Sequence, residues 1–180
     1  MTTNVFNEKQ IVWQEALNNF SKKENLIFLE TGRIRNPDWK TSDGNSTDFF
    51  SNQPCIKKCY SIDNDSENFS GFSTTEEYCR HILTNHQLSK IIFLNGNSVD
   101  IIKKINEKID VVLLDSLNDS DLIFNEFINI IEKISSESLI IVDDVNDKGI
   151  KGKKIIKLLE KNNIPFFIKK LIQMTVCFFI

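Results

Sequence analysis

The chain has 180 residues, a length that suits one domain with a buried core. Hydrophobic residues make up 41% of the sequence and charged residues 26%, and the formal net charge is -3. This composition is typical of a globular protein, and the acidic balance argues against general affinity for nucleic acid or an anionic membrane. The sequence shows neither a signal-peptide pattern nor an apolar run long enough to span a bilayer, so we expect a cytoplasmic protein.

The first part of the chain predicts a helix and then a buried strand. Residues 5–23 place apolar side chains near helical spacing, which indicates an amphipathic helix that precedes the core. Residues 25–30 (NLIFLE) form a short apolar run that is closed by an acid, as expected for a buried strand. A polar loop follows, and Asn45-Ser46-Thr47 marks the entry to the next helix.

The rest of the chain alternates between predicted strands and helices. Further strands are predicted at residues 57–63, 90–95, 109–115 and 138–144. Helices are predicted from residue 73, where Ser73 with Glu76 and Thr74 with Glu77 both have capping-box spacing, and at 98–107, 122–134 and 151–161. The last sixteen residues indicate two strands with a turn near 172–174.

This alternation defines the expected fold class. Strand–helix–strand units with continuous apolar strands predict a parallel sheet with helices on both faces. A parallel crossover needs a dozen residues or more, so the final strand should run antiparallel to its neighbour. We therefore expect a single α/β domain over residues 1–180, with residues 1–24 as an N-terminal helix and 25–180 as the core. Its sheet would be doubly wound, Rossmann-like, mostly parallel and seven-stranded, with a C-terminal antiparallel strand.

The carboxyl ends of the predicted strands are unusually acidic. They carry Glu30, Asp63, Asp115, Asp143 and Asp144. Ligands of open α/β sheets bind at these ends, and so many carboxylates at one edge would repel one another unless ligands or cations were present. Asp63, at the end of the second strand, has the expected position of a carboxylate that accepts both hydroxyls of a ribose.

The loop after the first strand separates the candidate nucleotide cofactors. A dinucleotide site needs the glycine pattern G-x-G-x-x-G, whereas this chain has Glu30-Thr31-Gly32-Arg33-Ile34-Arg35, with one glycine. No P-loop is present either. A cofactor without phosphate, such as S-adenosylmethionine, suits this looser loop better than NAD does.

With these segments in place, the sequence resembles the class I S-adenosylmethionine-dependent methyltransferases. NLIFLETG, the downstream GNST at residues 44–47 and CYSID look like the first two cofactor motifs of that family. NGNSVDIIKKI, KIDVVLLDS and SLIIVDDVN are similar to the later blocks of the catechol O-methyltransferase-like group. The resemblance extends over nearly the whole chain from residue 25 onward.

The resemblance implies roles for individual residues. The methionine end of the cofactor would lie against Glu30 and Gly32, the ribose against Asp63, and the adenine against Asn97-Ser98. The full set of implied cofactor-binding residues is Glu30, Thr31, Gly32, Asn45, Ser46, Asp63, Asn97, Ser98 and Asp115. Asp115 is also the catalytic candidate. It would form a divalent-metal site with Asp143 and with Asp144, an acid where the group often has an amide. Three hard oxygen ligands favour Mg²⁺.

Two departures from the group stand out. Residues 33–43 form a long insertion in the first cofactor loop, and the position of the catechol enzymes' lysine base is Asn118. The insertion holds a basic and aromatic cluster of Arg33, Arg35, Trp39 and Lys40. This cluster is either a lid over an anionic group or a solvated loop.

The expected function is O-methylation of a small molecule with S-adenosylmethionine and divalent-metal assistance. A small-molecule acceptor is the expected partner, with no nucleic acid and no membrane, and a homo-oligomer is compatible with the sequence. The alternatives are a non-catalytic methyltransferase-like domain that binds a ligand or partner and, less favoured, an NAD-dependent enzyme.

Overall fold

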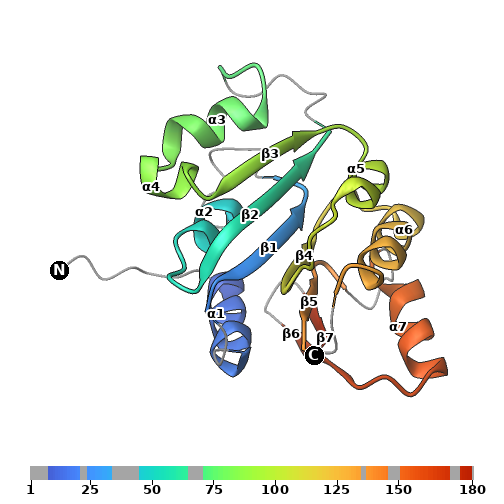
Figure 1. Cartoon of the computed structure of the whole chain (residues 1–180). Helices are drawn as coiled ribbons and strands as arrows, with labels where there is room; N and C mark the ends of the chain where they lie inside the picture. Colours follow the sequence, from blue (N-terminus) through green and yellow to red (C-terminus); the bar gives the residue numbers. More distant parts are fainter. Residues whose placement is uncertain are drawn as a thin grey trace.

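The computed structural model describes residues 8–20, 24–33, 45–64, 71–134, 137–145, 151–170 and 175–179. Its strands pair in the order β3-β2-β1-β4-β5-β7-β6. The strand bounds are β1 (Leu26–Thr31), β2 (Ile56–Asp63), β3 (Ile91–Asn95), β4 (Val111–Leu114), β5 (Leu139–Val142), β6 (Phe166–Lys170) and β7 (Thr175–Phe179). Every pairing from β3 to β5 is parallel, so the carboxyl ends of these five strands lie along one edge (Figure 1).

The expected fold class requires a correction. We expected a Rossmann-like sheet of seven strands that included a C-terminal antiparallel strand. The Rossmann-like unit is instead a five-stranded, all-parallel sheet, β3-β2-β1-β4-β5, and no antiparallel strand belongs to it. The C-terminal pair β6 and β7 extends this unit at β5, where β7 pairs with residues 140–142 in the opposite direction. The five strands are parallel because long crossovers join them, whereas the short β6–β7 connection forces a reversal.

Helices cover both faces of the parallel sheet (Figure 1). One face packs against helices from the first half of the chain: α1 (Glu8–Phe20), α2 (Ser46–Ser51), α3 (Thr75–Ile82) and α4 (Asn85–Leu88). The other face packs against α5 (Ser98–Lys104), α6 (Ser120–Ile131) and α7 (Lys153–Lys161). The sequence predicted one helix from residue 73, whereas the structure divides this segment into α3 and the short helix α4.

The core divides into two layers because successive strand residues point to opposite faces. In β1, Phe28 faces the α1–α4 side and Leu29 faces the α5–α7 side. The first layer is aromatic, since the rings of Phe28 and Phe50 stack with centroids 4.0 Å apart and Trp13 lies 5.4 Å from Phe50. The α1 helix is therefore anchored to the sheet through α2.

Helix α1 lies within the amphipathic segment that the sequence predicted at 5–23. It begins at Glu8 and ends at Phe20, while residues 5–7 and 21–23 fall outside the described ranges. Its buried side chains are Lys9, Val12, Trp13, Ala16 and Leu17, and the lysine is the unexpected member of this set. Within the described ranges, every helix is too short or too polar to cross a membrane.

Candidate functional site

The loops after β1, β2, β4 and β5 meet at the carboxyl edge of the sheet. The Gly32 amide donates to the Ile62 carbonyl at 2.9 Å, and the Asp115 amide donates to the Thr31 carbonyl at 3.0 Å. The Asp143 amide continues the series with the Leu114 carbonyl at 3.1 Å. The acids predicted at the strand ends therefore do lie along one edge, but their environments differ.

Glu30 is enclosed within the protein. Its side chain is fully buried and accepts hydrogen bonds from the hydroxyls of Ser46, Thr47 and Ser61. Burial raises the pKa of Glu30, while these hydroxyls and the charge of Arg33 oppose the rise. The carboxylate thus joins β1, α2 and β2 from the inside, and its contact with a cofactor stays a prediction.

A second buried carboxylate, Glu126 of α6, lies on the opposite side of β1. It accepts hydrogen bonds from the hydroxyls of Thr31, at 2.9 Å, and Ser98. Burial raises the pKa of Glu126, and the hydroxyl contacts oppose this effect. Thr31 and Ser98, both predicted to bind the cofactor, therefore donate hydrogen bonds to Glu126, which was not predicted as a site residue. A signal was available, since Glu126 shares the helical face of Ile123, Phe127 and Ile130.

Gly32 has a structural reason to be glycine. Its φ is +86°, and a Cβ built there would lie 2.3 Å from the backbone oxygen of Asp115. Any side chain would push the β1 loop away from the β4 loop. The residue lies at the predicted place beside the acidic edge, but close packing alone accounts for it.

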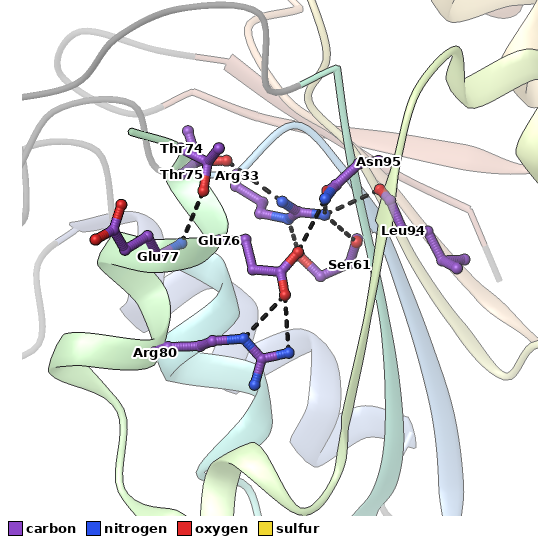
Figure 2. Close-up of polar contacts among 9 residues, drawn as sticks. All are labelled: Arg33, Ser61, Thr74, Thr75, Glu76, Glu77, Arg80, Leu94 and Asn95. Carbon is purple, nitrogen blue, oxygen red and sulfur yellow. Dashed lines mark hydrogen bonds and ion pairs between the residues drawn. The ribbon is translucent and has the colours of Figure 1, made fainter. Parts of the chain in front are cut away.

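Arg33 is buried, and its side chain links the ends of β2 and β3 through hydrogen bonds. Its Nη2 donates to the carbonyls of Ser61 and Leu94, at 2.8 and 2.9 Å, and to Oδ1 of Asn95 at 2.8 Å. Figure 2 shows the guanidinium enclosed by these groups, with Thr75 on its other side. Arg33 is only 4% exposed, so the solvated-loop alternative is wrong for this residue, and the lid over an anionic group stays a prediction. The other lid candidates, Arg35, Trp39 and Lys40, lie outside the described residues.

The network around Arg33 continues to the surface through α3 (Figure 2). Asn95 donates to Glu76 at 2.9 Å, and Arg80 donates to the same carboxylate at 2.9 Å. Partial burial raises the pKa of Glu76, but the hydrogen bonds from Asn95 and Arg80 outweigh it and the net shift is downward. Helix α3 begins here with Thr74 as its N-cap, which accepts from the Glu77 amide at 3.1 Å.

Asp63 ends β2, as predicted, and remains partly exposed. Its Oδ2 accepts from the Thr75 hydroxyl at 3.1 Å and from the Arg33 amide at 3.4 Å, while Oδ1 accepts from the Asn64 amide. These contacts fix the carboxylate in place. Carboxylate oxygens have further lone pairs, so Asp63 can still accept hydrogen bonds from a ligand.

Asn45 is a buried polar residue with an unsatisfied side chain. It is 2% exposed, and neither its amide nitrogen nor its amide oxygen has a hydrogen-bond partner among the residues that the structure describes. It precedes α2 with a φ of +46° and lies next to Ser46, which contacts Glu30. Buried amides are rarely left unsatisfied, so this side chain is a candidate to bind a ligand group.

Asn97 and Ser98 lie at the start of α5. The side chain of Asn97 is exposed and accepts a hydrogen bond from the Asp100 amide, so it caps the helix. Their expected contact with adenine is compatible with this exposed position and remains a prediction.

The three carboxylates of the predicted metal site converge. Asp115, Asp143 and Asp144 each place one oxygen within 4.8 Å of the others. This convergence requires the chain to turn before Asp144, since neighbouring strand residues point to opposite faces. β5 does end at Val142, and Asp144 has a φ of +53°.

Two lysines offset most of the negative charge of this cluster. The ammonium of Lys9 pairs with Asp143, and that of Lys151 lies 2.5 Å from Asp115 and 3.6 Å from Asp144. Burial and the Asp115 charge raise the pKa of Asp143, while Lys9 opposes the rise. Burial lowers the pKa of Lys151, but the nearby carboxylates outweigh it and the net shift is upward.

This arrangement does not fit a divalent metal ion. Three carboxylates and two ammonium groups leave one net negative charge, and both lysines are 3% exposed. A metal ion would have to displace a buried ammonium group or lie beside it, and like charges repel strongly in a buried site.

A polar pocket of ≈ 280 Å³ opens beside the cluster. It is lined by Arg33, Asp115, Ser116, Leu117, Asn118, Asp144 and Lys151. The pocket thus connects the β1 loop with the loops after β4 and β5. Its volume is near the lower end of the range usual for small-ligand sites.

The chain matches no protein-family model, and no curated protein is similar to it in sequence. Among solved structures, it superposes on a precorrin-6y C5,15-methyltransferase from Geobacter metallireducens with a TM-score of 0.65 and 11% identity, covering 99% of this chain and 91% of that one. It also matches a candidate O-methyltransferase from Klebsiella pneumoniae, with a TM-score of 0.69 and 10% identity, over 100% and 83% of the two chains.

A third match is the MycE methyltransferase of the mycinamycin biosynthetic pathway, solved in complex with Mg and SAH. Its TM-score is 0.63 with 11% identity, over 93% of this chain and 48% of that one. Identities this low establish a shared fold and nothing further. The chain therefore has the class I methyltransferase fold, and its activity is a separate question.

Proposed function

We propose that this protein is an S-adenosylmethionine-dependent methyltransferase that acts on a hydroxyl group of a small molecule. The proposal depends most on Asp63, a fixed and partly exposed carboxylate at the end of β2 in a methyltransferase fold. The end of the second strand of such a sheet is where a carboxylate can accept the hydroxyls of a ribose.

The loop after β1 supplies a second group for the cofactor. The amide nitrogen and amide oxygen of Asn45 have no partner among the described residues, and the side chain is buried beside the hydroxyl groups that contact Glu30. An amide of this kind can bind both the ammonium and the carboxylate of an amino acid. Asn97 and Ser98 would border the adenine, as the sequence resemblance implies.

Asp115 is the residue of the pocket best placed to orient an acceptor. It lies at the end of β4 with its side chain 21% exposed, and its Oδ1 is held by Lys151. When bound, the cofactor would supply an electrophilic methyl group for the acceptor oxygen and leave as S-adenosylhomocysteine, and the proton of the acceptor hydroxyl would pass to Asp115 or to water. Asp115 would accept a hydrogen bond from that hydroxyl and so align it, which is the main task in such a displacement.

Two observations favour oxygen as the acceptor atom. The later blocks of the sequence resemble the catechol O-methyltransferase-like group, and the structural neighbours include a TDP-rhamnose 3'-O-methyltransferase with a TM-score of 0.62.

The described part of this chain consists of the sheet and its covering helices, without a separate substrate domain. The acceptor would therefore be bound by the loops at the carboxyl edge.

The second candidate is a non-catalytic domain that binds a cofactor or another small ligand. It is favoured by Asn118, which stands where the catechol enzymes have their lysine base. It is also favoured by the closed contacts of Glu30 and Arg33, which are complete without a ligand.

Equilibrium binding and turnover separate these functions. We expect S-adenosylhomocysteine to raise the melting temperature of the protein and NAD⁺ to leave it unchanged. Formation of S-adenosylhomocysteine from S-adenosylmethionine with a panel of phenols, catechols and sugars then tests catalysis. Binding without turnover would support the second candidate, and a preference for NAD⁺ would exclude both.

A further inference from the structure

The acidic cluster beside the pocket contains its own cation. Lys151 contributes an ammonium group 2.5 Å from Asp115 and 3.6 Å from Asp144, and the side chain is 3% exposed. Asp143, the third member, is fully buried and paired with Lys9 of α1. Each of the three carboxylates of this cluster is thus in contact with an ammonium group.

The backbone near Lys151 fixes the position of this ammonium group. Gly152 follows it with a φ of +74°, and a Cβ built on Gly152 would lie 2.6 Å from a methyl group of Val145. Val145 is buried and comes directly after Asp144. The start of α7 is therefore packed against the loop that carries two of the three acids, which keeps Lys151 beside them.

Lys151 also faces the space where an acceptor would bind. It lines the pocket together with Asp115 and Asn118. An ammonium group has three protons to donate, and Asp115 accepts one of them, whereas Asp144, at 3.6 Å, is an ion-pair partner beyond hydrogen-bond distance. The ammonium group can therefore also donate to an oxygen atom in the pocket, next to the Asp115 carboxylate that would orient the same group.

We propose that Lys151 takes the place of a divalent metal ion, so that Lys151 and Asp115 together bind the acceptor hydroxyl in a metal-independent site. This inference depends on the proposed function for the identity of the bound hydroxyl. The statement that the site excludes divalent cations depends only on the ion pairs, and it can be tested without an acceptor.

The test measures Mn²⁺ binding from the signal of the free ion in electron paramagnetic resonance. The wild-type protein should bind no Mn²⁺ at this site at concentrations up to about 1 mM, where weak oxygen-ligand sites are occupied. Lys151→Met leaves two net negative charges among the same groups, so its affinity for Mn²⁺ should be at least about tenfold higher. Asp115→Asn in the Lys151→Met background should remove the new site.

Two matched variants control for charge and for folding. Lys151→Arg retains the positive charge and should exclude Mn²⁺ as the wild type does. Lys154→Met removes a lysine of α7 that is 46% exposed and pairs with Asp121, and it should not create a site. If Lys151→Met does not fold, Lys151→Gln offers a neutral side chain that can still donate to Asp115.

The outcomes are distinct. Stoichiometric Mn²⁺ binding by the wild type that Asp115→Asn abolishes would overturn the proposal, because the site would then be a metal site. Absence of Mn²⁺ binding in every folded variant, Lys151→Gln included, would overturn it as well, because Lys151 would not be what excludes the cation. Binding of S-adenosylhomocysteine to the same preparations tests the proposed function separately, so failure of one does not imply failure of the other.

Discussion

Gly32 packs against the backbone of Asp115, so the loop that follows β1 touches the loop that follows β4. A Cβ at Gly32 would lie 2.3 Å from the Asp115 carbonyl oxygen and 2.8 Å from its carbonyl carbon. Asp115 in turn lies beside Lys151 and lines the pocket. The only glycine of the expected cofactor loop that the structure describes therefore sets the position of the proposed acceptor-binding carboxylate.

We expect Gly32→Ala to destabilise the protein by about 2 kcal/mol or more, because the clash is with backbone and the positive φ adds strain. Gly71→Ala is the matched control. Gly71 has a similar φ of +89° but no atom within 4 Å of a built Cβ, so only the strain remains. Urea unfolding of both variants measures the difference. Equal losses of unfolding free energy would show that the contact with Asp115 carries no cost.

Arg33 should be far more important for stability than its position in a polar loop indicates. Replacing it with alanine leaves the carbonyls of Ser61 and Leu94 without their buried donor, so we expect a loss of about 2–5 kcal/mol. Arg80→Ala, in the same network (Figure 2) but 55% exposed, should cost no more than about 1 kcal/mol. Chemical denaturation measures the free energy of unfolding of both variants. A smaller loss for Arg33→Ala than for Arg80→Ala would contradict the role of Arg33 in linking β2 to β3.

Glu30 should make stability depend on pH. Burial raises its pKa above the unfolded value of 4.5, so the folded state retains a proton that the unfolded state has already lost. The wild type should therefore lose stability relative to Glu30→Gln as the pH rises from 4.5 through the folded-state pKa. The slope is at most about 1.4 kcal/mol per pH unit. Unfolding free energies at several pH values test this, and a wild type that gains stability over this range would contradict it.

Most strands were predictable because they contain a continuous apolar run of four residues, as β1, β3, β4, β5 and β7 do; β2 and β6 lack such a run. The acids at the strand ends were predictable as a group because parallel strands place their carboxyl ends together. What the sequence overstated was the extent of the Rossmann-like unit. The C-terminal segments do form strands, but β7 runs antiparallel to β5 and β6 pairs with β7, so neither belongs to the all-parallel unit.

The ion pairs of the acidic cluster could not be predicted from the sequence in the same way. Lys9 pairs with an acid 134 residues further along the chain, and Lys151 with one 36 residues earlier. Lys9 did carry a signal, since it shares a helical face with Val12, Trp13 and Ala16. Arg33 and Lys151 carried none, because a basic residue in a polar loop is usually solvated, and their burial depends on which strand ends lie beside them.

Calorimetric titration of S-adenosylhomocysteine into the wild type, Asp63→Ala and Asp100→Ala tests the central claim most directly. We expect the wild type and the exposed control Asp100→Ala to bind equally. Asp63→Ala should lose about 1.5–3 kcal/mol of binding free energy, which corresponds to a dissociation constant roughly 10- to 150-fold larger. A wild type that does not bind S-adenosylhomocysteine, or an Asp63→Ala variant that binds with unchanged affinity, would contradict the proposed cofactor site.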